Sequence, residues 1–275
     1  MPWVAPHLDG GLGNRLFQYA AATGLAERWK FDTTFLASRF GNNNHGSIAT
    51  LFRMFPSVPL IDIDGPILEL KEAEGAMYSF TDYDVVPSVP TLIRGTRQNI
   101  QYFPKNLSAL EPDWNTALGG PLVRTFLAQD AGLLTRPQQE KTVSIHFRLG
   151  DYRYIPHHQI DLGNYYRVAL DRVPTGHRVH LFSDEPSLCH AYFQAYAARK
   201  GLTFTVAKVR SDVETLYEMS LCLGGNIVGN STFSWWGAWY AHTAGSPWAT
   251  YPDKWGAGLP SPGGLVPTWG EQITV

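Results

Sequence analysis

Hydrophobic and polar positions follow a regular order in the second half of the chain. Short runs of β-branched and aromatic residues alternate there with stretches whose apolar positions recur at helical spacing. The predicted strands are 142–148, 178–183, 202–207, 226–228 and 248–251. The predicted helices are 164–173, 186–200, one that opens with the capping box Ser211–Glu214, and 233–244. This order predicts an α/β fold with a doubly wound parallel sheet and right-handed crossovers.

The first half is less regular. A glycine-rich turn at 9–15 leads into a helix predicted from about 16 to 30, whose apolar residues recur at steps of four. Between 31 and 138, proline and glycine interrupt short apolar pieces, which predicts irregular α/β structure. The polar stretch 135–141 is the predicted boundary, giving an N-terminal domain 1–138 and a C-terminal domain 139–275.

Composition narrows the function classes. A net charge of -2 over 275 residues provides no basic surface for nucleic acid or an anionic membrane. No apolar run approaches the ~20 residues of a membrane span and no signal peptide precedes the first strand, so we expect a soluble, cytoplasmic protein or a soluble catalytic piece. Cys189 and Cys222 are far apart in sequence and are predicted to be buried thiols.

The strand at 142–148 carries the first candidate site residues. His146 and Arg148 are two apart and therefore point to the same face of a strand. Gly150 ends the strand, and Asp151 opens the loop at its carboxyl end, where ligands bind in open α/β sheets. The forked guanidinium of Arg148 suits a phosphate, but from this segment alone a structural ion pair with Asp151 is favoured.

Two further loops follow predicted strands. Asp184 could accept hydrogen bonds from a nucleobase or ribose, or could cap the helix that follows, and the cap is favoured. The loop 229–234 opens a helix, so its hydroxyls and backbone N–H groups could hold a phosphate without a metal. The alternative is an ordinary N-cap with Trp235 and Trp239 in the core, while Phe233 and Trp236 could stack on a base or sugar.

The glycine-rich turn has three interpretations. A dinucleotide fingerprint fails because Leu16 occupies the third small position and Pro6 breaks the preceding strand. A Walker loop would need Gly-Lys-Ser/Thr, which is absent. The third interpretation is a tight turn that lets the backbone approach a nucleotide sugar.

Two acidic pairs are candidates for a Mn²⁺ site. Asp62-Ile-Asp64 and Asp82-Tyr-Asp84 have the spacing found in metal-dependent glycosyltransferases. Ordinary turn sequences explain both pairs more simply, because Asp64 precedes Gly65 and Asp84 leads into Val-Val-Pro. We therefore expect no metal site.

Four segments together resemble one family. His146-Phe-Arg-Leu-Gly-Asp-Tyr152 resembles the His-x-Arg-Arg-Gly-Asp-Tyr motif of the α-1,2-fucosyltransferases of glycosyltransferase family 11, with Leu149 in place of the second Arg. The segment 10–21 resembles the opening motif of that family, with Arg15 in place of Gln. The segments 182–185 and 230–239 resemble two more of its motifs, in family order.

The resemblance implies a GT-B-like fold of two facing Rossmann-like domains, with the donor held mainly by the C-terminal one. It implies transfer of L-fucose from GDP-β-L-fucose to the 2-hydroxyl of a galactose in a glycan, with inversion and without a metal or other cofactor. Arg148 would stabilise the leaving GDP, and the base candidates are Asp151, then His146, then His7 or Asp9. The expected donor-binding residues are Gly11, Gly13, Asn14, Arg15, Arg148, Asp184, Asn230, Ser231, Thr232, Phe233 and Ser234.

Three rival functions remain open at this point. They are a protein O-fucosyltransferase, a non-catalytic GDP-sugar or glycan-binding protein, and a metal-dependent glycosyltransferase built on Asp62 and Asp64. Acceptor specificity is expected to lie in 31–138, where Asn42–His45 and Arg94–Arg97 are candidate sugar contacts.

Overall fold

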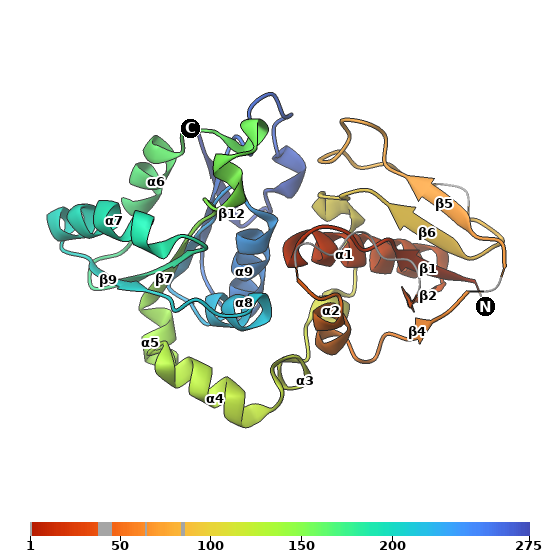
Figure 1. Ribbon diagram of the computed structural model, residues 1–275, viewed down its shortest axis with the longest axis horizontal. Coiled ribbons are helices and arrows are strands. Elements are labelled where there is room, and N and C mark those ends of the chain that lie inside the picture. The colour runs from red at the N-terminus through yellow and green to blue at the C-terminus, as the bar shows by residue number, and fades with distance from the viewer. Residues whose placement is uncertain (1, 38–45, 64, 84–85) are drawn as a thin grey trace. The chain divides into compact units, whose positions relative to one another are not determined.

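The computed structural model describes the chain except residues 1, 38–45, 64 and 84–85 (Figure 1). By its internal contacts the chain divides into two compact units. The first comprises Met1–Gly119 with Gly263–Leu265, and the second comprises Gly120–Pro262 with Val266–Val275.

The second unit is built on a six-stranded sheet in which all the paired strands run parallel. From one edge to the other the strands are β12 (Gly270–Ile273), β11 (Ala249–Pro252), β10 (Gly225–Ile227), β7 (Thr142–Phe147), β8 (Arg178–Ser183) and β9 (Thr203–Val206). The chain runs outward from β7 to β9, returns to β10 on the other side of β7, and runs outward again to β12. The predicted doubly wound parallel sheet is confirmed, and its order reverses between β7 and β10.

Two layers of helices cover this sheet. Val143, Ile145 and Phe147 of β7 share one hydrophobic cluster with residues of α6 and α7. On the opposite face, Phe182 of β8 clusters with Met219 of α8. The helices are α6 (Gly163–Leu170), α7 (Pro186–Lys200), α8 (Asp212–Ser220) and α9 (Thr232–Thr243), and α8 begins with the predicted capping box at Ser211. The strand β7 is thus buried on both faces, which fixes where its carboxyl end lies.

Helices α4 (Pro121–Asp130) and α5 (Arg136–Glu140) belong to the second unit. Leu133, between them, is fully buried in the cluster that contains Phe182 and Met219. Asp130, at the end of α4, forms ion pairs with Lys208 and Arg210. The contact boundary therefore lies before α4 and not at 138–139, because the polar stretch 135–141 is part of the second unit.

The first unit contains a smaller parallel sheet. Its strands are ordered β2 (Asp32–Thr33), β1 (Trp3–Pro6), β6 (Thr91–Arg94) and β5 (Leu68–Lys71), and β3 (Phe35–Leu36) pairs with β4 (Leu60–Ile61). Helix α1 (Leu12–Trp29) packs Ala22, Leu25 and Trp29 against Val4 and Ile93 of this sheet. The remaining elements are short: α2 (Ala49–Met54), η1 (Ile100–Tyr102), η2 (Leu107–Leu110), α3 (Trp114–Leu118) and η5 (Gly263–Leu265).

One helix start and one whole strand differ most from the sequence prediction. Helix α1 begins at Leu12 rather than near 16, because Gly11 is extended and serves as the N-cap inside the glycine-rich turn. Strand β12 was missed because Glu271 and Gln272 are exposed on this edge strand, so its sequence lacks an apolar run. No helix in the described part of the chain is long and apolar enough to cross a membrane.

Candidate functional site

Three loops meet at the carboxyl edge of the six-stranded sheet. Arg148 follows β7, Asp184 follows β8, and Asn230 and Ser231 follow β10. Since β7 and β10 flank the reversal of strand order, the connections that leave them diverge to opposite faces of the sheet. The space between them is the usual ligand crevice of such sheets. The structure thus brings together the candidate residues of the second unit that the sequence analysis had named.

Arg148 is held between two carboxylates. Its Nη2 lies 2.8 Å from Oδ1 of Asp151, and its Nη1 lies 3.1 Å from Oδ2 of Asp184. Its guanidinium carbon lies 5.7 Å from the ring centre of Tyr152, within range of a cation–π contact. The side chain is 33% exposed, so the fork is fixed in direction and still reachable from solvent. The predicted ion pair between Arg148 and Asp151 is confirmed.

Asp184 has a different role from the helix cap that the sequence favoured. Its Oδ1 accepts a hydrogen bond from the N–H of Leu149 (2.9 Å), and its Oδ2 accepts one from the N–H of Gly150 (3.0 Å). A side chain at position 150 would collide with this arrangement, because a Cβ there would lie 2.6 Å from Oδ2 of Asp184. Asp184 therefore fixes the loop that carries Arg148.

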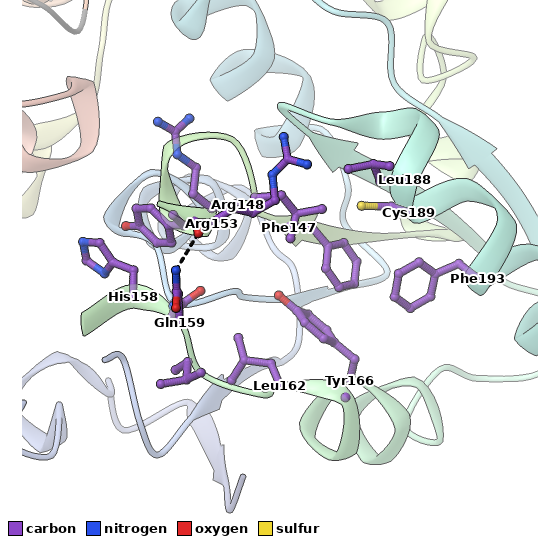
Figure 2. Close-up of a pocket in the computed structure, with 15 residues that line it drawn as sticks. Phe147, Arg148, Arg153, His158, Gln159, Leu162, Tyr166, Leu188, Cys189 and Phe193 are labelled. Carbon is purple, nitrogen blue, oxygen red and sulfur yellow. Dashed lines mark hydrogen bonds between the residues drawn. The ribbon is translucent and has the colours of Figure 1, made fainter. Parts of the chain in front are cut away.

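A pocket of about 350 Å³ lies beside Arg148 (Figure 2). Phe147, Tyr166 and Phe193 line its floor. The ring centre of Phe147 lies 3.9 Å from that of Tyr166 and 4.4 Å from that of Phe193. In Figure 2 the guanidinium groups of Arg148 and Arg153 lie on the side away from these rings. The site therefore joins an apolar recess to a rim on which two guanidinium groups are paired with carboxylates. Such a recess suits a ligand with a flat, weakly polar part.

The rim includes residues that the sequence analysis missed. The ring of Tyr152 stacks on that of His158 with their centres 3.9 Å apart, and Arg153 pairs with Glu185 at 2.8 Å. Burial raises the pKa of Tyr152 to about 12, so its hydroxyl stays protonated and uncharged. Tyr152 lies within the matched motif and could have been named from it. His158 lies in an irregular loop without periodic pattern, so the sequence contains no signal for it.

His146 lies in the interior rather than on the rim. It is 6% exposed, its ring lies 5.9 Å from that of Phe233, and its Nδ1 has no hydrogen-bond partner among the described residues. Burial, and secondarily the charge of Arg148, lowers the pKa of His146 to about 3. An imidazole with this pKa is neutral at physiological pH but is a weak base. The burial of His146 therefore argues against its expected role as a base.

The third loop leads into the first turn of α9. Ser231 is the N-cap with no hydrogen bond from its side chain to the helix, and the amides of the first turn lack intrahelical partners by helix geometry. Thr232 and Phe233 are half-exposed, while Asn230, Ser231 and Ser234 are buried. Asn230 donates to the carbonyl of Trp255 (3.3 Å), and Ser234 donates to that of Ser231 (3.0 Å), so both stabilise the loop.

One aromatic prediction for this helix is wrong. Trp236 is 0% exposed and therefore cannot stack on a ligand. Trp235 and Trp239 are in the core, as predicted.

The glycine-rich turn belongs to the first unit. The N-cap of α1 is Gly11, which has no side chain to accept from the first-turn amides, and that turn contains no acidic residue. The first-turn amides of α1 can therefore receive an anion. Asn14 accepts a hydrogen bond at its Oδ1 from Nε2 of Gln98 (3.2 Å), and Gly13 is buried in the first helical turn. Arg15 is 1% exposed and donates to the carbonyl of Gly46 (3.0 Å), so its expected contact with the donor is not available in this conformation.

Three further candidates, Arg97, Arg94 and His7, also belong to the first unit. Arg97 is fully buried and donates to the hydroxyl of Tyr83 and the carbonyl of Leu70, so its proposed sugar contact is wrong. Arg94 donates to Nε2 of His7 (3.0 Å), and burial followed by the charge of Arg94 lowers the pKa of His7.

Part of the acceptor and metal candidates falls outside the described residues, namely Asn42–His45, Asp64 and Asp84. Asp82, by contrast, pairs with Arg28 at 2.8 Å. Within the described chain, no group of three or more His, Cys, Asp and Glu side chains could hold a metal ion.

Comparisons with known proteins bear on the fold more than on the chemistry. No family model matches the sequence. The O-antigen biosynthesis glycosyltransferase WbnK of Escherichia coli is 31% identical over 130 residues, which are 44% of this chain and 41% of that protein. The chain thus aligns with about two fifths of the length of this curated relative.

Two crystal structures of the fucosyltransferase NodZ from Bradyrhizobium share the fold. One gives a TM-score of 0.51 at 10% identity over 86% of this chain and 92% of NodZ. The selenomethionine form gives a TM-score of 0.51 at 9% identity over 86% of this chain and 91% of NodZ. The predicted α/β fold class with parallel sheets is therefore confirmed, and identities this low extend the likeness to the fold alone.

The buried, neutral His146 predicts a specific acid dependence of stability. Because a histidine in the unfolded chain has a pKa of about 6.5, the unfolded state binds this proton more readily than the folded state below that pH. The free energy of unfolding should therefore fall as pH drops from about 6.5 toward 3, and this group should add no slope above 6.5. In His146→Phe the fall should be shallower, by at most about 1.4 kcal/mol per pH unit. Denaturant unfolding at a series of pH values measures this, and equal slopes in both proteins would contradict the burial of a neutral imidazole.

Proposed function

We propose that the chain is a fucosyltransferase that uses GDP-β-L-fucose as its donor. The observation that carries the proposal is the fork of Arg148, held at the carboxyl end of a buried strand where the order of a parallel sheet reverses. An arginine in that place is suited to a phosphate, and the pocket beside it offers an apolar surface for another part of the donor. The choice of guanosine and fucose comes from the motifs that include Arg148, Asp184 and Ser231.

The chemistry asks the protein to stabilise charge on the leaving group. As the bond between fucose and the β-phosphate breaks, its electron pair passes to GDP and the sugar becomes oxocarbenium-like. Arg148 and the first-turn amides of α9 are fixed before the reaction, so they need little reorganisation to stabilise that charge. We include the first turn of α1, with Gly11, Gly13 and Asn14, as a further proposed donor contact.

The acceptor hydroxyl attacks from the side opposite GDP, which inverts the anomeric carbon. Its proton passes to a base, for which Asp151 is the first candidate because it is 37% exposed and lies within the Arg148 loop. Neither the positioning nor the charge stabilisation described above requires a metal, and we propose a metal-independent reaction.

The finer proposal is an α-1,2 linkage to the 2-hydroxyl of a terminal galactose in a glycan. It is supported by the motif resemblance to the α-1,2-fucosyltransferases and by similarity to a glycosyltransferase named for O-antigen biosynthesis, which points to a glycan acceptor. A protein O-fucosyltransferase is the main alternative, because a similar arginine motif serves that reaction.

Replacing Arg148 should impair catalysis more than folding. Loss of one preorganised donor to a developing anion typically removes about 2.7–4 kcal/mol of transition-state stabilisation, so Arg148→Ala should lower kcat/KM at least about a hundredfold. Arg172→Ala is the matched control, because it also removes a guanidinium paired with a carboxylate, that of Glu271, and Arg172 does not line the pocket. A folded Arg148→Ala protein that transfers fucose at a near-normal rate would refute the role of this residue.

The acceptor class is tested by turnover of GDP-fucose with an acceptor panel. We expect transfer to β-galactosides and not to folded protein domains, with the product carrying fucose on O2 of galactose by NMR. The rate should be unchanged by EDTA. Transfer to a protein hydroxyl would establish the alternative, and donor binding without any turnover would indicate a non-catalytic protein.

A further inference from the structure

Both terminal nitrogens of Arg148 already have carboxylate partners. Nη2 faces Asp151 and Nη1 faces Asp184, so a phosphate that approaches either terminal nitrogen competes with a carboxylate for it. The charges around the fork point the same way. Arg148 and Arg153 contribute two positive charges, whereas Asp151, Asp184 and Glu185 contribute three negative ones. An arriving diphosphate therefore meets a net negative rim unless one carboxylate leaves.

The two carboxylates that face Arg148 are held very differently. Asp184 accepts hydrogen bonds from two backbone amides with its two oxygens and stands between β8 and α7. Its side chain is 25% exposed. Removing it would leave the amides of Leu149 and Gly150 without these partners and release the loop.

Asp151 has weaker support. It opens the short 3-10 turn η3 (Asp151–Arg153), its side chain is 37% exposed, and Arg148 is its one ion-pair partner among the described residues. Ion pairs this exposed contribute little to stability, so Asp151 can be displaced at small cost.

We infer that Asp151 is an exchangeable counter-ion that occupies the place of the donor phosphate, and that Asp184 is the fixed positioning residue that keeps Arg148 aimed at it. This inference rests on the proposed donor. It assigns opposite effects to two carboxylates that lie on the same guanidinium.

Calorimetric titration with GDP, and separately with inorganic pyrophosphate, tests the assignment on the full chain. Asp151→Asn removes the competitor, so both ligands should bind about two- to fivefold more tightly. Asp184→Asn replaces one of the two oxygens that accept from the amides of Leu149 and Gly150, so both ligands should bind at least about tenfold more weakly. Glu185→Gln removes the same charge from the neighbouring pair with Arg153, and affinity should stay within about twofold.

Tighter binding in Asp151→Asn together with weaker binding in Asp184→Asn supports the inference. A general charge effect would tighten binding in both variants, and a merely structural role would weaken it in both. Equal signs, or no change in Asp151→Asn, overturn it. Gly150→Ala is a second variant that leaves every charge in place, in case Asp184→Asn does not fold. Its new methyl group would meet Oδ2 of Asp184, so it should also weaken binding.

The two ligands separate this inference from the proposed function. Wild type that binds pyrophosphate but not GDP would refute the guanosine donor. The effects of the two variants on pyrophosphate affinity would still test the inference. Wild type that binds neither ligand refutes both.

Discussion

The position of Arg148 depends on the burial of the strand before it. All six residues of β7 are buried between two layers of helices, and neighbours on both sides fix its register. A strand held in this way ends at a fixed position, so the backbone of the first residue after it, Arg148, is also fixed. Asp184, at the end of the adjacent strand, then ties the next two amides to the same sheet edge. The fork of Arg148 is preorganised because its supports are parts of the sheet.

The second half of the fold could be predicted because local pattern and burial agree there. The strand at Arg178–Ser183 and the helix at Pro186–Lys200 lie where the sequence placed them, since a short apolar run marks the strand and a proline marks the first helical position. The edge strand β12 could not be predicted, because a strand with one neighbour does not need an apolar sequence. Similarly, the polar residues 135–141 form a capped helix that packs on the second unit, and polarity alone does not distinguish such a helix from a linker.

The sequence predicted which residues of the second unit lie near one another better than it predicted what each residue contacts. The alternation of strands and helices predicted a parallel sheet, and this placed Arg148, Asp184 and Ser231 at one sheet edge. The direction of a side chain depends on tertiary neighbours, so sequence could not show that Asp184 binds loop amides, that Trp236 is buried or that Arg15 turns into the first unit. The interior position of His146 is a similar case, because a histidine on a buried strand looks the same in sequence whether or not a ligand reaches it.

The central claim is that Arg148 binds the diphosphate of a GDP-sugar, and ligand-dependent thermal stability tests it most directly. Wild type and Arg148→Ala are melted with GDP, UDP or ADP, each with and without EDTA. A ligand at a hundred times its Kd stabilises the folded state by about 2.7 kcal/mol, which gives a readable rise in Tm for a chain of this size. The account predicts a rise with GDP alone that is insensitive to EDTA and absent in Arg148→Ala. A rise with UDP that requires a metal would contradict it and direct attention to Asp62 and its neighbours.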